Sequence, residues 1–163
     1  MPWTTKVLVV ANITATSEEL RAALLQRAQI GSAKFTLIVP SDPVAGGRDL
    51  ARARLGEALG QLRDAGLDID GRVGSGDPIL AVSDEWDPRS YDEIIISTLP
   101  MRLSKWLHAG LPERVEKLTG ARVTHVVSQP PKPEIETSPA PVHENHGVMT
   151  PLKVLSWGTQ RQP

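Results

Sequence analysis

The sequence predicts a doubly wound α/β protein with three layers, in which helices cover both faces of a parallel sheet. Three observations lead to this prediction. Short apolar runs rich in β-branched residues alternate with longer segments whose apolar residues recur at helical spacing. Glycine, proline and helix-capping residues separate the two kinds of segment. The connections are long enough for right-handed crossovers between parallel strands.

The first strand and helix are expected near the start of the chain. Residues 6–11 form a continuous β-branched run, which is typical of a strand buried on both faces. Thr16 and Glu19 have the spacing of a capping box, and Gly31 is placed to end the helix in a left-handed conformation. The apolar stripe of this helix contains Leu20, Ala23, Leu24 and Ala28.

The second strand is predicted at residues 34–39 and ends before Pro40. A loop rich in proline and glycine leads to a helix at about residues 48–65, which Gly66 ends. Apolar and charged residues then alternate over residues 67–73, as in a half-buried strand near a sheet edge. One face of the helix carries Ala51, Leu55, Ala58, Leu59 and Leu62.

Asp77 and Pro78 predict the start of a short third helix, because aspartate caps free amides and proline at the first helical position lacks one. The fourth strand is expected at residues 93–98 and the fifth at 122–127, with a helical segment within 103–119. We therefore predict one domain over residues 1–128.

The last 35 residues differ in composition, since they hold seven of the fourteen prolines. We interpret residues 129–163 as a C-terminal tail, in which residues 152–157 have the pattern of a short docking strand.

Composition narrows the class of protein. Of the 163 residues, 40% are hydrophobic and 23% are charged, as in an ordinary globular protein. The net charge is −1 without any block of one sign, so we expect neither a nucleic-acid nor a membrane partner. The chain has no cysteine and no apolar run long enough for a membrane span or a signal peptide, which favours a cytoplasmic protein.

Four segments, at residues 7–12, 76–78, 92–97 and 113–115, resemble in order and spacing the universal stress protein family over residues 5–128. The resemblance implies a five-stranded parallel sheet in the order 3-2-1-4-5, and a homodimer formed near the fifth strand. It also implies a role in stress response or regulation.

The ATP-binding members of that family carry Gly-x-x-Gly, nine further residues, and then Gly followed by Ser or Thr. These glycines let backbone amides approach phosphate oxygens. Here the glycine pair falls on Ser97 and Pro100, and the last two positions fall on Gly110 and Leu111. A register shifted by one residue places Ala109 and Gly110 in the last two positions, and neither register restores the first pair. ATP binding is therefore expected to be lost or weakened.

A ligand, if one binds, is expected in the crevice where the first and fourth strands diverge, because the strand order reverses there. The family's acidic residue at the end of the first strand corresponds to Asn12, and its adenine contact corresponds to Val39. The residues expected to line this crevice are Ala11, Asn12, Val39, Ser97, Thr98, Arg102 and Gly110.

The leading hypothesis is a non-catalytic universal-stress-protein-like module. The alternative is a nucleotide- or anion-binding protein that uses ATP or another adenine nucleotide, with Arg102 and Lys105 of the basic loop 101–108 and the helix near Gly110 as anion contacts. Slow nucleotide hydrolysis is a third, weaker hypothesis, because no catalytic motif is present.

Other constellations are interpreted as structural. His143 and His146 lack a third strong metal ligand nearby, so we predict no metal site. The acidic cluster Asp84, Glu85 and Asp87 is expected to be a solvated helix end. Trp106 and Leu107 are expected in the core, and His125 either faces a dimer partner or packs against a helix.

Overall fold

The computed structural model describes residues 3–130. It contains one five-stranded sheet in the order β3-β2-β1-β4-β5, and every neighbouring pair is parallel. This confirms the predicted fold class and strand order. The strands are β1 (Thr5–Val10), β2 (Ala33–Pro40), β3 (Ile69–Gly74), β4 (Glu93–Thr98) and β5 (Arg122–Val127).

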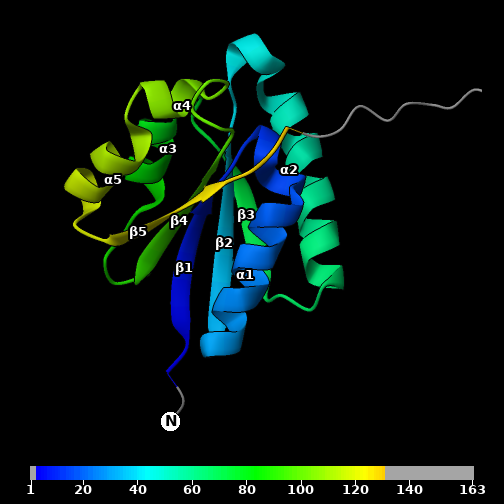
Figure 1. Cartoon of the computed structure of the whole chain (residues 1–163), viewed down its shortest axis with the longest axis vertical. Helices are drawn as coiled ribbons and strands as arrows, with labels where there is room; N and C mark the ends of the chain where they lie inside the picture. Colours follow the sequence, from blue (N-terminus) through cyan, green and yellow to red (C-terminus); the bar gives the residue numbers. More distant parts are fainter. Residues whose placement is uncertain (1–2, 131–163) are drawn as a thin grey trace, which may run out of the picture. The chain divides into compact units, whose positions relative to one another are not determined.

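Helices cover both faces of the sheet, with α1 and α2 on one side and α3, α4 and α5 on the other (Figure 1). The α-helices are α1 (Glu18–Ile30), α2 (Gly47–Asp64), α3 (Pro78–Glu85), α4 (Lys105–His108) and α5 (Leu111–Thr119). Two short 3-10 helices, η1 (Ile13–Thr16) and η2 (Pro43–Ala45), follow β1 and β2.

The central strand β1 divides the core into two halves. Val7 and Val9 pack into the half under α1 and α2, whereas Leu8 and Val10 pack into the half under α3 and α5, and all four are fully buried. Successive side chains of a strand point to opposite faces, so a continuous apolar run supplies both halves.

Glycines allow α2 and α3 to lie close to the edge strand β3. A Cβ atom on Gly71 would lie 2.6 Å from Leu55 Cδ1 and 2.7 Å from the carbonyl oxygen of Leu37. A Cβ atom on Gly74 would similarly meet Ala81 and Ile38 at 2.8 Å. These two positions set the distance between the sheet and the helices above it.

Two local predictions are wrong in detail. The cap of α1 is Ser17 rather than Thr16, because η1 extends to Thr16 and the Ser17 hydroxyl accepts the Leu20 amide at 3.1 Å. Gly31 is extended, with φ 178°, rather than left-handed. The helical segment predicted within 103–119 is present and consists of two helices, since Gly110 at φ 69° separates α4 from α5.

The remaining strand and helix predictions agree closely with the structure. No helix within residues 3–130 is long and apolar enough to cross a membrane. The predictions for His143, His146 and residues 152–157 fall outside the described residues, and the division into a domain at 1–128 and a tail at 129–163 stays a prediction.

Candidate functional site

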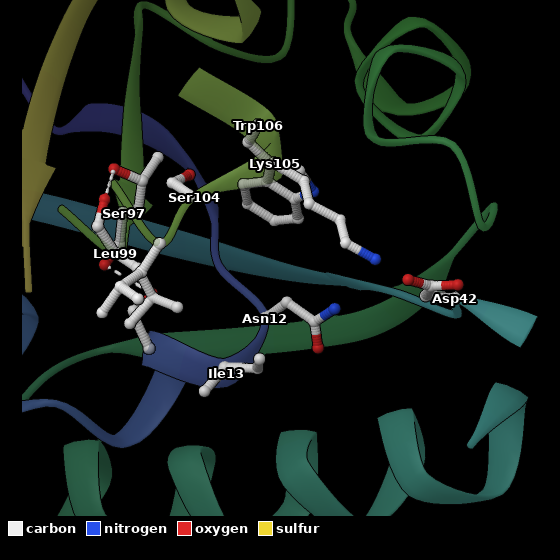
Figure 2. A pocket seen from close by; sticks show the side chains of 11 residues that line it. Asn12, Ile13, Asp42, Ser97, Leu99, Ser104, Lys105 and Trp106 are labelled. Atoms are coloured by element: carbon white, nitrogen blue, oxygen red, sulfur yellow. Dashed lines mark hydrogen bonds between the residues drawn. The ribbon is translucent and has the colours of Figure 1, made fainter. Parts of the chain in front are cut away.

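A pocket of about 170 Å³ lies at the carboxyl edge of the sheet, between the ends of β1 and β4 (Figure 2). The crossovers that leave β1 and β4 run to opposite faces, so their first loops separate and leave a crevice between them. The pocket is lined by residues 12–14 after β1, Asp42 after β2, residues 97–99 of β4 and its loop, and residues 103–106.

The structure places three of the expected site residues, Asn12, Ser97 and Thr98, on the wall of this pocket. Ala11 and Val39 do not line it, because they belong to the fully buried core under α1 and α2. The alternation of side chains along β1 and β2 directs both residues into that core. Whether any of these residues contacts a ligand stays a prediction.

The two expected residues from the loop after β4 also lie off the pocket wall. Arg102 is exposed in a turn and is not among the lining residues. Gly110 precedes α5, and its amide already donates to the carbonyl oxygen of Leu107 at 3.0 Å. Of the basic residues of loop 101–108 that were expected to contact an anion, only Lys105 reaches the pocket.

Sequence reasoning did not place Ile13, Thr14, Asp42, Leu99, Leu103 and Ser104 in the site. Trp106 was expected in the core, but it is half-buried and both packs on the core and lines the pocket. Ser104 could have been found from the sequence, because serine is a preferred residue at the start of a helix. Its hydroxyl caps the short helix α4 by accepting the Leu107 amide at 3.2 Å.

Asn12 is held by an arginine from a distant helix. Nη1 of Arg54 in α2 donates a hydrogen bond to Oδ1 of Asn12 at 2.7 Å. Figure 2 shows the Asn12 side chain in the space between Lys105 and Ile13. An amide oxygen bound to a guanidinium leaves the Nδ2 group as the main polar group of Asn12 that can meet a ligand.

Buried hydroxyl groups fill the floor of the crevice. Ser97 Oγ donates to Thr14 Oγ1 at 2.7 Å and lies 3.1 Å from Ser128 Oγ, which in turn lies 2.8 Å from Ser17 Oγ. Ser97, Thr14 and Ser128 are all nearly or fully buried. The hydroxyl at position 97, where the family's motif has its first glycine, therefore binds protein groups.

The corner after β4 departs from the family's phosphate-binding motif at two further positions. Pro100 has no amide, and its carbonyl oxygen accepts the Leu103 amide in a tight turn at 2.8 Å. Leu111, at the position of the family's hydroxyl residue, is 1% exposed in the core, and Pro112 follows it at the start of α5. This segment is shaped by apolar packing.

His125 of β5 contacts the pocket wall from behind. Thr98 Oγ1 forms a hydrogen bond of 2.7 Å with His125 Nε2 and lies 2.9 Å from the carbonyl oxygen of Leu99, to which its hydroxyl can donate. Burial lowers the pKa of His125 from its usual value, and the carboxylate of Glu113 opposes this shift.

The acidic cluster at the end of α3 is only partly solvated. Glu85 accepts a short hydrogen bond from the Tyr91 hydroxyl and lies 3.4 Å from Arg72 Nη1, whereas Asp84 and Asp87 are exposed. Burial, followed by the hydrogen bond to Glu85, raises the pKa of Tyr91. Within residues 3–130, no group of three or more histidine and acidic side chains is arranged to hold a metal ion.

The strand order and the crevice between β1 and β4 define a doubly wound α/β protein with a pocket at its switch point. The chain has the fold of the universal stress proteins. A universal stress protein solved in complex with cAMP matches it with a TM-score of 0.55 at 23% identity, covering 79% of this chain and 100% of the other.

A second solved structure, the universal stress protein from Archaeoglobus fulgidus in complex with dAMP, matches with a TM-score of 0.55 at 14% identity. That match covers 77% of this chain and 99% of the other. No protein-family model matches the sequence, and no curated protein is similar to it.

Proposed function

We propose that this chain is a non-catalytic universal-stress-protein-like module in stress response or regulation, in which the binding of magnesium-ATP is lost or weakened. The observation that carries the proposal is the corner after β4. There Pro100 has no amide to donate, and the hydroxyl of Ser97 already donates to Thr14. Leu111 is buried at the position where the family's motif has a hydroxyl residue.

The donor set at the end of β1 supports the same proposal. A carboxylate at that position would accept hydrogen bonds and help to bind Mg²⁺, which prefers oxygen ligands. Asn12 instead has its only side-chain oxygen bound to Arg54. Phosphoryl transfer depends on metal ions that neutralise charge on the phosphates, so these residues do not favour hydrolysis.

Thermal shift with ATP, ADP and AMP, each with and without magnesium, tests this proposal. A ligand present at 100 times its Kd stabilises a folded protein by about 2.7 kcal/mol. We expect millimolar magnesium-ATP to leave the melting temperature unchanged and no phosphate to be released above the buffer rate. A clear stabilisation by magnesium-ATP that exceeds that by AMP would overturn the proposal.

A second candidate function is the binding of a small adenine nucleotide or a related anion in the crevice. The pocket is open, has apolar walls at Ile13, Leu99 and Leu103, and presents Trp106 beside Lys105. The volume of the pocket, about 170 Å³, is smaller than the roughly 300 Å³ of the smallest sites for drug-sized ligands. The pocket therefore suits one ring system of a ligand, with the ligand's other groups at the pocket mouth. The two structural neighbours hold cAMP and dAMP, each with one phosphate.

We further propose a cytoplasmic homodimer that pairs through the edge strand β5. The absence of cysteine supports a reducing compartment. The side chains of β5 are exposed or half-buried in the single chain, and Val127 is 45% exposed. Light scattering after size exclusion should give twice the mass of one chain, and Val127→Lys should shift the equilibrium toward the monomer.

A further inference from the structure

We infer that Arg54 makes Asn12 a hydrogen-bond donor toward the pocket, and that Asn12 and Lys105 together form a subsite for the single anionic group of an aromatic ligand. The ligand class is a ring system that carries one phosphate, as in a nucleoside monophosphate. This inference rests on the second candidate function, crevice binding, and specifies which residues hold the anion.

The contact between Arg54 and Asn12 sets the direction of hydrogen bonding. The guanidinium is always charged and donates to Oδ1 of Asn12 over 2.7 Å, although 42 residues separate the two in sequence. Both side chains are half-buried, which strengthens the contact relative to one in water. The Nδ2 group, with two hydrogens and no acceptor capacity, is then available to an oxygen of the ligand.

Lys105 supplies the positive charge on the opposite wall. It is the first residue of α4, whose cap Ser104 is buried, so the stem of Lys105 begins at a fixed point. Figure 2 shows its ammonium group extending toward the space between Asn12 and Asp42. Among the described residues, Lys105 has no carboxylate within 4.0 Å.

Asp42 limits how much negative charge the subsite accepts. One oxygen of its carboxylate already accepts the Val44 amide at 2.9 Å, and the side chain lines the same pocket as Lys105. Each further phosphate adds negative charge to a pocket that already holds this carboxylate, and like charges repel. The side-chain arrangement therefore favours a monophosphate over a triphosphate.

The apolar walls give the ligand's ring a defined place. Trp106, next to Lys105, has its ring in the cavity, and Leu99 and Leu103 line the same pocket. An aromatic ring packed on indole gains stacking beyond the area it buries. The adjacent residues Lys105 and Trp106 thus recognise the anion and the ring. This recognition does not need backbone amides at Pro100, which has none, or at Gly110, whose amide is bound to Leu107.

Isothermal titration of the full chain with AMP and with adenosine tests the subsite. We expect the wild type to bind AMP at least about 10-fold more tightly than adenosine, since hydrogen bonds to charged groups are roughly twice as strong as those between neutral groups. Lys105→Met and Asn12→Asp should each lower the affinity for AMP much more than that for adenosine, and so remove most of this preference. Asn12→Asp keeps the contact to Arg54 but puts a negative charge where the phosphate would lie.

Arg54→Met tests the positioning role directly. Without the guanidinium, the Asn12 amide can rotate, so AMP affinity should fall while adenosine affinity holds, and Arg54→Lys should restore part of the preference. Arg102→Met is the matched control, because it removes a cation of the same loop that does not line the pocket, and it should change neither affinity. Melting temperatures of all variants show whether each remains folded.

The outcomes separate the two levels of the proposal. Equal binding of AMP and adenosine by the wild type, or an unchanged preference in Lys105→Met and Asn12→Asp, would overturn the subsite while crevice binding stands. A wild type that binds neither compound at millimolar concentration would overturn crevice binding and the subsite together. The expected preference, lost in both variants and kept in Arg102→Met, would establish the subsite.

Discussion

The hydroxyl of Ser97 donates a hydrogen bond of 2.7 Å to the hydroxyl of Thr14, and both side chains are at least 97% buried. The contact joins the end of β4 to the 3-10 helix that follows β1, across 83 positions of sequence. It fixes the relative position of the two loops between which the pocket lies. Ser97 is therefore a structural group at the point where a phosphate-binding loop would begin.

Ser97→Ala should lower the free energy of unfolding by about 1–3 kcal/mol, because it leaves the buried hydroxyl of Thr14 without its partner, whereas Ser128 keeps its contact with Ser17. In a double-mutant cycle with Thr14→Val, the two changes should be non-additive by at least about 0.5 kcal/mol, as expected for residues in contact. Urea denaturation measures both quantities. Ser83→Ala, at an exposed position of α3, should change stability by less than about 0.5 kcal/mol.

Gly71→Ala should destabilise the protein by about 1–3 kcal/mol, because the new methyl group would meet a backbone oxygen of β2 that cannot move aside easily. Gly56→Ala, in the middle of α2 with nothing within 4 Å of the added Cβ, should instead stabilise it by about 0.5–1 kcal/mol. Opposite shifts in urea midpoint are expected. Equal effects of the two substitutions would contradict the close approach of β3 to Leu55.

The pKa of His125 should lie below 6.5 in the folded protein, because burial disfavours its charged form. Glu113→Gln should lower this pKa further, since it removes the carboxylate that favours the charged form. NMR titration of the ring protons, assigned with His125→Asn, measures both. The unfolded chain binds more protons between the two pKa values, so stability falls as the pH drops from 6.5 through the folded pKa. In His125→Asn, the loss of folding stability on acidification should be smaller.

Tyr91 is the single tyrosine of the chain, and its pKa should lie above 10.0 in the folded protein because of burial and the carboxylate of Glu85. The phenol form is favoured on folding, so its contribution to stability is complete below pH 10.0 and is lost as the pH rises through the folded pKa. Glu85→Gln should lower the pKa of Tyr91. Ultraviolet difference spectroscopy of the phenolate measures the change, and an unshifted value in the wild type would contradict the Glu85 contact.

Local sequence patterns were sufficient for the elements of the sheet. The run of β-branched residues around Val7 to Val10 predicted a strand buried on both faces, and Asp77 with Pro78 predicted the start of α3. Both signals act over a few residues, where steric preferences and unpaired amides decide the conformation. The capping of α1 was misassigned by one residue because Thr16 and Ser17 are both good caps, and η1 occupies the first.

The residues of the candidate site were harder to predict from local sequence patterns. Ala11 and Val39 were correctly placed at strand ends, but the direction of each side chain depends on strand alternation, and both point into the core. The loop between Pro100 and Gly110 contains a short helix that brings Lys105 and Trp106 to the pocket and leaves Arg102 outside. No local pattern specifies which basic residue of such a loop turns inward.

The sequence by itself determined the class of fold and the position of the crevice, because alternating strands and helices with right-handed crossovers leave one place where the strand order reverses. Tertiary structure alone decided the chemistry of that crevice. Arg54 comes from a helix whose pattern shows only an amphipathic face, yet it binds the side-chain oxygen of Asn12 at the wall of the crevice. Such a contact depends on how helices pack across the sheet edge, which no single segment of the chain encodes.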